Sequence, residues 1–537
     1  MEPTNEQRAA IEALDARVCV DAGAGSGVPW RRGREIVGTA FVIGVLSVFG
    51  SAYAAAEWAN ADFWLYPVMS TRKLTFYYWG QNRLANLVPA LAFPFRDPFT
   101  NAHVQMFISG AAFVGVTAIT HRLLSGSVVH GDRATAPPGM APGGLHRGEG
   151  TTGPVAALSA AVRPIVLLAT IGVFLLVVEP NVVYTFFYEQ PYGISLACFL
   201  LGAVALFGPR PVGFRLIGLA LLVAALLVSP TTVVFGGLVV GVALLIGRWR
   251  DTALFVVGTA VALVLSVVAS TTVGPPAASD LYTKFEPDGA ITKWRTAASN
   301  IWQSFQYGPL IVVMLISVVT IVAGWERLSP TSRALLWLCP PFAVVWTAVF
   351  ALNAWVRTNG SPYRYFLPVY LVVLVVVLVA VTLIAQLVVE RSPRLVSAAP
   401  PVGGAAAALL LAMAVIMWTP LAEYTSMKAV EEPVSYAREH DIRFVGGTYW
   451  KTWPAVLALG DSGHEVFGLA ERGQAMATEV NAAAQELLAA GRPVRILCID
   501  LEAEWCLRAM AATTGRAWST ERVESEAPLV LEVAPEP

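Results

Sequence analysis

About eleven long apolar stretches dominate the sequence and restrict what the chain can fold into. Most are long enough for a helix to cross a hydrocarbon core of roughly 30 Å, which takes about 20 residues. In such a core the backbone polar groups must bond to one another, so helices are the expected form. The pattern predicts an all-α polytopic membrane bundle of about 11 transmembrane helices. The stretches run near residues 36–56, 102–123, 162–178, 191–208, 213–229, 231–247, 252–274, 308–325, 334–353, 365–388 and 402–419.

Composition agrees with a membrane bundle. Hydrophobic residues make up 56% of the chain and charged residues only 14%, against about 25% charged in soluble domains. The net charge is −1 and the basic residues are scattered, so no nucleic-acid partner is expected. One apolar run, 213–247, is interrupted by Ser229-Pro230 and reads either as a tight hairpin or as one re-entrant element. Arginine pairs at both ends favour the hairpin.

Basic residues predict the orientation of the bundle. If the N-terminus is cytoplasmic, most arginines between spans lie on the cytoplasmic side. An odd number of spans then makes the C-terminus extracytoplasmic. Eight basic residues occupy the opposite loops, where they are candidates for binding anions or anchors at the membrane interface. These eight are Arg72, Lys73, Arg83, Lys284, Lys293, Arg295, Arg357 and Arg364.

Residues 1–35 do not belong to the bundle pattern. Thr4–Ile11 and Val20–Gly27 resemble the opening of UvrD/RecB-type helicases, in which a glutamine and a strand precede a phosphate loop. A working phosphate loop needs Lys and Ser or Thr after its last glycine, whereas Val28-Pro29-Trp30 follows Gly27 here. We expect no ATPase activity and interpret the segment as the result of a fusion or of a misassigned start.

Two segments of the chain are predicted to be soluble. Residues 125–160, within the bundle region 36–420, are rich in Gly, Pro, Ser and Thr and are typical of a flexible cytoplasmic linker. Residues 421–537 alternate strand and helix patterns, which predicts an extracytoplasmic α/β domain. Its strands are expected at 442–445, 465–469, 494–500 and 529–533, and its helices at 448–459, 475–490 and 502–512.

Cysteines and candidate metal ligands are few. Cys498 and Cys506 both fall in the C-terminal domain, where they either form a disulfide or remain two buried thiols. His130 and His146 have no cysteine at metal-ligand spacing. No metal-binding constellation of carboxylates is visible, so no cofactor is predicted.

The first loop after span one carries the candidate catalytic acids. Glu57 and Asp62 lie among aromatic residues just beyond the span, where a carboxylate can take a proton from an acceptor hydroxyl. Each also reads as an exposed acid beside an aromatic belt. Apolar residues at helical spacing over 84–91, with Arg83 beside them, predict a helix lying in the interface, and the loop 275–307 repeats this design. Arg364, in Arg-Tyr-Phe-Leu-Pro before a late span, suits a phosphate.

Taken together, these features resemble the GT-C-fold membrane glycosyltransferases, most closely bacterial members related to protein mannosyltransferases and the aminoarabinose transferase of lipid A. The resemblance covers most of residues 36–420 through short motifs. It implies a bacterial inner-membrane enzyme that moves a sugar from a polyprenyl-phosphate donor to an extracytoplasmic glycan or protein acceptor. Asp62 would then be the base and Arg364, with Arg83, would contact the donor phosphate. Many members carry two adjacent acids, whereas Glu57 and Asp62 are separated here. Some members use a divalent cation.

Two other functions remain open from the sequence. A transporter or flippase for a lipid-linked glycan would be favoured by helices broken within the membrane, and Pro340-Pro341 is the strongest such signal outside the hairpin. A non-catalytic scaffold of the cell envelope would use the C-terminal domain to bind a partner.

Overall fold

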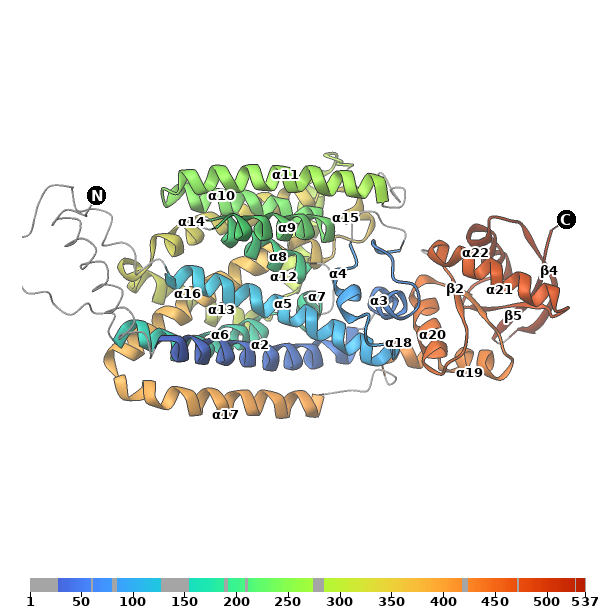
Figure 1. Cartoon of the computed structure of the whole chain (residues 1–537), viewed down its shortest axis with the longest axis horizontal. Coiled ribbons are helices and arrows are strands. Elements are labelled where there is room, and N and C mark those ends of the chain that lie inside the picture. The colour runs from blue at the N-terminus through green and yellow to red at the C-terminus, as the bar shows by residue number, and fades with distance from the viewer. Residues whose placement is uncertain are drawn as a thin grey trace, which may run out of the picture.

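The computed structural model of the chain describes residues 28–58, 61–79, 85–126, 154–187, 192–207, 211–273, 284–417, 424–470, 473–526 and 528–536. The helicase-like residues 1–27 and the greater part of the predicted linker, 127–153, lie outside these ranges. The described chain is mainly helical and ends in a small sheet (Figure 1).

A helix occupies most of each predicted apolar stretch, because a long apolar run can satisfy its backbone only internally. These helices are α2 (Val28–Trp58), α5 (Pro98–Gly126), α6 (Pro154–Val177), α8 (Tyr192–Leu206), α9 (Val212–Val228), α10 (Phe235–Leu245), α11 (Trp249–Val273), α13 (Tyr307–Ala323), α14 (Pro330–Phe350), α16 (Leu367–Arg391) and α17 (Pro393–Met417).

Length and composition identify fewer membrane spans than the sequence predicts. Within the described residues, 4 helices are long and apolar enough to cross a membrane, namely those over Pro98–Leu124, Trp249–Val273, Pro330–Phe350 and Tyr363–Arg391. Helices α7 (Pro180–Phe187) and α8 are bent by 56° relative to each other, and if they count as one span the number of candidate spans rises to 5. Six shorter apolar segments complete the bundle, and three of them belong to the long helices α2, α6 and α17. The number of eleven spans therefore stays a prediction.

Consecutive long helices of the bundle run in opposite directions between its two ends (Figure 1). At one end, which we call the linker end, α5 finishes at Gly126 and α6 begins at Pro154. At the other, the α/β end, α5 begins at Pro98 and the C-terminal residues 424–536 pack against the bundle. Predicted cytoplasmic arginines such as Arg122, Arg248 and Arg391 share the linker end, although which side of a membrane this end faces stays a prediction.

Two proline signals have different outcomes. Ser229-Pro230 does separate two helices, since α9 and α10 are joined by the 3₁₀ turn η3 (Pro230–Val234), as the hairpin interpretation expects. Pro340-Pro341 does not break its helix, because α14 continues from Pro330 to Phe350. The described helices that differ in direction across a short gap are instead α7 and α8, whose axes are inclined by 56°.

Short helices cover the α/β end of the bundle. They are α3 (Ala61–Thr71), α4 (Leu87–Ala92), α7, α12 (Ala290–Gln303), α15 (Ala354–Thr358) and the 3₁₀ turn η6 (Tyr363–Phe366), while η5 (Trp325–Arg327) lies at the linker end. The helix predicted over 84–91 is only six residues long and begins at Leu87. The residue before it, Asn86, is buried, and its side-chain amide donates to the Thr75 carbonyl oxygen (2.8 Å), which favours a non-helical backbone at that position. The helix predicted within 275–307 is present as α12.

The C-terminal residues form one sheet with the strand order β2-β1-β3-β5-β4. The strands are β1 (Phe444–Gly447), β2 (Phe467–Leu469), β3 (Val494–Ile499), β4 (Trp518–Glu526) and β5 (Leu529–Pro535). Strands β2, β1 and β3 are parallel, and β5 and β4 are antiparallel additions. The helices are α18 (Thr425–Lys428), α19 (Glu431–Glu439), α20 (Tyr449–Asp461), α21 (Ala477–Ala489) and α22 (Ala503–Thr514), with η8 (Gly473–Met476) before α21. We call this part the C-terminal α/β unit.

The predicted strands and helices of this unit are all present, within about two residues at most boundaries. Helices α18 and α19 and strand β4 were not predicted. Strand β4 carries no apolar signal in the sequence. Its residues are mostly charged or hydroxylated and exposed, and one polar edge strand resembles a loop in sequence.

Candidate functional site

The predicted catalytic acids lie at the junction of two helices on the α/β end. Glu57 belongs to the last turn of α2 and Asp62 to the first turn of α3. Their side chains, and Arg83 entirely, lie outside the part of the chain that the structure describes. The backbone therefore places one acid at the end of α2 and the other at the start of the next helix.

Helix α3 is firmly packed beyond Asp62, because a continuous stretch of its residues is buried. Residues 63–70 are all buried, and Trp64 and Leu65 are completely so. A buried polar network fixes α3 to its neighbours, since Asn101 of α5 donates to Ser70 Oγ (2.9 Å) and to the carbonyl oxygen of Ala92 (2.8 Å). Gln105 in turn donates to Asn101 Oδ1 (2.6 Å). A satisfied network of this kind specifies one arrangement.

The first loop also docks on the C-terminal α/β unit, which the sequence does not predict. Trp64 Nε1 donates to Ser426 Oγ (2.8 Å), and the hydroxyls of Tyr78 and Tyr449 share a hydrogen bond (3.0 Å). The ring of Trp79 packs edge-on against that of Trp453. Helix α20 packs along α3 (Figure 1), so one hydrophobic core continues from the bundle into the α/β unit.

Two of the eight candidate anion-binding residues serve this docking. Arg72 donates through Nη1 to the Val466 carbonyl oxygen (2.7 Å) and through Nη2 to that of His464 (3.3 Å). Burial lowers the pKa of Arg72 below its usual value, while the Glu465 charge opposes this. Lys73 forms an ion pair with Glu479 (2.8 Å). Both basic side chains thus join the loop to the α/β unit.

Three further basic residues converge on one carboxylate, Glu286, just before α12. Lys284 and Lys293 pair with it at 3.3 Å and 3.9 Å, and Arg357 of α15 pairs with it directly. The hydrogen bond from Lys284 and the nearby positive charges lower the pKa of Glu286. Glu286 was not predicted from the sequence, because the pairing with Arg357 joins segments 71 residues apart. These cations neutralise an internal acid, which leaves Arg295 and Arg364 as the other described members of the eight.

Arg364 lies in the tightly held turn η6. The turn follows Gly360 and Ser361, both with positive φ (76° and 50°), a backbone conformation that non-glycine residues adopt rarely. Asn300 of α12 donates to both their carbonyl oxygens (3.0 and 2.8 Å). On the other side, Trp346 donates to the Tyr365 carbonyl oxygen (2.7 Å). Side chains from two helices therefore fix this backbone, and the half-buried Arg364 guanidinium lies 5.3 Å from the centre of the Tyr365 ring.

Helix α7 connects the two halves of the candidate site. It packs against α2, which carries Glu57, and also contacts η6, which carries Arg364. All its residues from Val182 to Phe187 are buried. At its start, the Glu179 backbone N–H donates to the Ser304 carbonyl oxygen after α12 (3.0 Å). Helix α7 thus packs against both α2, where its Phe187 lies beside Gly50, and the Arg364 turn.

A pair of acids lies where α5 meets the α/β unit. Asp97 caps the start of α5, where its carboxylate accepts a hydrogen bond from the Thr100 backbone N–H (2.7 Å). Pro98 is the first residue of the helix, a position that suits proline. This hydrogen bonding to Thr100 keeps the pKa of Asp97 low. Asp461 ends α20 nearby, and desolvation together with its hydrogen bond to Asp97 raises its pKa. The contact therefore favours the protonated form of Asp461.

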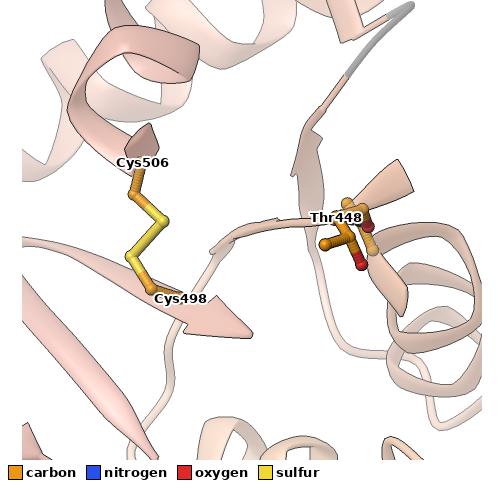
Figure 2. Close-up of a disulfide and its surroundings, with 4 residues drawn as sticks. Thr448, Cys498 and Cys506 are labelled. Atoms are coloured by element: carbon orange, nitrogen blue, oxygen red, sulfur yellow. Dashed lines mark hydrogen bonds between the residues drawn. A yellow bond between two sulfur atoms is a disulfide. The ribbon is translucent and has the colours of Figure 1, made fainter. Parts of the chain in front are cut away.

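Of the two alternatives that the sequence leaves open for Cys498 and Cys506, the structure has the disulfide, with Cα atoms 6.2 Å apart. It links the end of β3 to α22, close to Thr448 at the start of α20 (Figure 2). Gly446 of β1 makes room for it, because a Cβ there would lie 2.9 Å from the Cys506 sulfur. The bond therefore ties α22 to the central strand of the sheet.

Among the described residues, no group of three or more His, Cys, Asp or Glu side chains is arranged to hold a metal ion. No model of a known protein family matches the sequence, and no curated protein matches it. Proposals about function therefore rest on the sequence motifs and on the geometry of the α/β end.

Proposed function

We propose that this chain is a GT-C-type membrane glycosyltransferase that moves a sugar from a polyprenyl-phosphate donor to a glycan or protein acceptor at the α/β end. One observation carries the proposal. The Arg364 turn is braced by Asn300 and Trp346, and α7 contacts both that turn and the helix that leads to Glu57 and Asp62. A guanidinium on a braced turn, and two acids at the end of α2 and the start of α3, suit a phosphate leaving group and a proton acceptor.

Each residue has a defined role in this proposal. Asp62, in the first turn of α3, removes the proton of the acceptor hydroxyl, and Glu57 is the alternative base. Arg364, with Arg83, offsets the charge that develops on the lipid phosphate. The docked α/β unit holds α3 still, which keeps the base in a fixed position relative to the bundle.

Sugar transfer in proteoliposomes from polyprenyl-phosphate-linked donors tests the proposal. Asp62→Asn should reduce the rate by about 100- to 10,000-fold, the usual cost of losing a general base. Arg364→Ala should raise the KM for the donor, because the lost charge faces the phosphate in the ground state as well. Asp288→Asn and Arg96→Ala are matched controls, since both change exposed charges on the same end of the bundle.

Two results would contradict this assignment. Full activity of Asp62→Asn would transfer the role of base to Glu57 or to another residue. Absence of transfer by the unmodified protein with every donor and acceptor tried would favour a carrier of lipid-linked glycans. The bend of 56° between α7 and α8 is the observation that favours that second function. Movement of a labelled lipid-linked glycan across the bilayer, without sugar transfer, would identify the carrier.

A further inference from the structure

A large cavity runs inside the bundle from the linker end to Pro368, at the start of α16 and close in sequence to Arg364. It measures about 990 Å³ and is enclosed by α5, α8, α10, α14 and α16. Its lining reaches the linker end at Arg122, Arg248 and Pro330, and extends along the bundle to Leu196 and Pro368. Arg122 and Arg248 are exposed, so the cavity opens to the surface at the linker end.

The interior of this cavity is apolar. Leu, Val, Ala and Phe side chains make up most of the wall, and the polar lining is limited to Thr120, Arg122, Arg248 and Thr331. Water needs two to four polar partners to occupy a cavity, so this interior does not suit it. An empty space of this size would forfeit dispersion contacts along its whole wall. A hydrocarbon chain matches both the shape and the chemistry.

The mouth has the opposite character. Arg248 pairs with Asp251 (2.9 Å) and lies near the Phe207 ring. Arg122, the other arginine at the rim, forms no ion pair with any residue of the described chain. Guanidinium groups bind phosphate through paired N–H donors. Basic pockets between helices near a membrane surface bind the headgroups of anionic lipids.

We propose that the cavity holds an acyl chain of an anionic phospholipid from the adjoining leaflet, with the lipid phosphate at Arg122 and Arg248. As an alternative occupant the segment 127–153 suits this cavity poorly, because its sequence is polar and carries Arg133 and Arg147. The lipid phosphate of this proposal lies at the linker end of the cavity, whereas Asp62 and Arg364 of the glycosyltransferase proposal belong to the α/β end.

Native mass spectrometry of the delipidated full chain tests this site. Phosphatidylglycerol and phosphatidylcholine with identical acyl chains are added separately. Phosphatidylglycerol should bind about fivefold or more tightly, the effect expected for about one guanidinium near a lipid phosphate. Arg122→Gln with Arg248→Gln should remove that preference. Arg250→Gln is the matched control, because Arg250 lies at the same end and does not line the cavity.

A second variant tests the chain-binding part separately. Val242→Phe adds bulk to the α10 wall of the cavity near its mouth, so it should reduce the retention of both lipids. Leu245→Phe, on the exposed surface of the same helix, should not. Equal binding of the two phospholipids by the unmodified protein would overturn the proposal. So would selective retention of polyprenyl phosphate that phosphatidylglycerol fails to displace, since the cavity would then belong to the donor.

Discussion

Arg72 Nη1 donates a hydrogen bond of 2.7 Å to the carbonyl oxygen of Val466, a residue 394 positions further along the chain. This bond joins the end of α3 to the start of β2 and fixes the α/β unit beside the loop that carries Asp62. The Cβ of a larger residue at Gly460 would lie 2.5 Å from Arg72 Nη2, so the absence of a side chain there admits the guanidinium.

Arg72→Ala should loosen the docking of the α/β unit by about 1–3 kcal/mol, because two carbonyl oxygens lose their buried charged donor. Hydrogen exchange of residues 464–466 in the full chain measures this loosening. Arg96→Ala is the control, since Arg96 is exposed and stacks locally on Phe93. Unchanged protection in Arg72→Ala would show that the aromatic contacts alone hold the unit.

Trp64→Phe should lower the apparent melting temperature of the protein in detergent. The substitution removes the hydrogen bond to Ser426 from a completely buried indole, at a cost of about 1 kcal/mol or more, and leaves a small void. Trp302→Phe serves as the comparison, because Trp302 is 55% exposed. Equal melting temperatures for the two variants would contradict the importance of the α3 contact.

The contact between Asp97 and Asp461 should strengthen as the pH falls from neutral to mildly acidic values. The pKa of Asp461 is raised in the docked structure, so its ionised form opposes docking above that pKa and protonation removes the opposition. The pKa of Asp97 is lowered, so the stability that its ionised form contributes is lost only below the ordinary carboxyl range of about 4. Proteolysis of the full chain across this window should slow on acidification. Asp461→Asn should remove that dependence, and a slope that persists would assign it to another group.

Alkylation under denaturing, non-reducing conditions should modify three of the five cysteines, because Cys498 and Cys506 are joined. Reduction should raise the number to five. The replacement of both by Ala should cost about 2–3 kcal/mol by the loop-entropy relation, since the bond closes a short loop with a sequence separation of 8. Five modified residues before reduction would show two free thiols.

The helices of the bundle were predictable because their signal is local. A run such as 365–388 is apolar at nearly every position, and in the structure α16 spans Leu367–Arg391. The buried strand β3 was predictable from 494–500 for the same reason. Strand β4 was not, because its alternating charged residues resemble a loop and its pairing with β5 decides its conformation.

The sequence by itself determined which segments are helices, that basic residues divide between two sets of loops, and that Cys498 and Cys506 are candidates for pairing. Only the tertiary structure decided what the charged residues of the loops do. Arg72 and Lys73 bind the α/β unit, and Arg357 pairs with Glu286, although all three looked equally suited to an external anion. The physical reason is that helix formation depends on neighbours a few positions away, whereas the partner of a charge is set by contacts between segments tens to hundreds of residues apart.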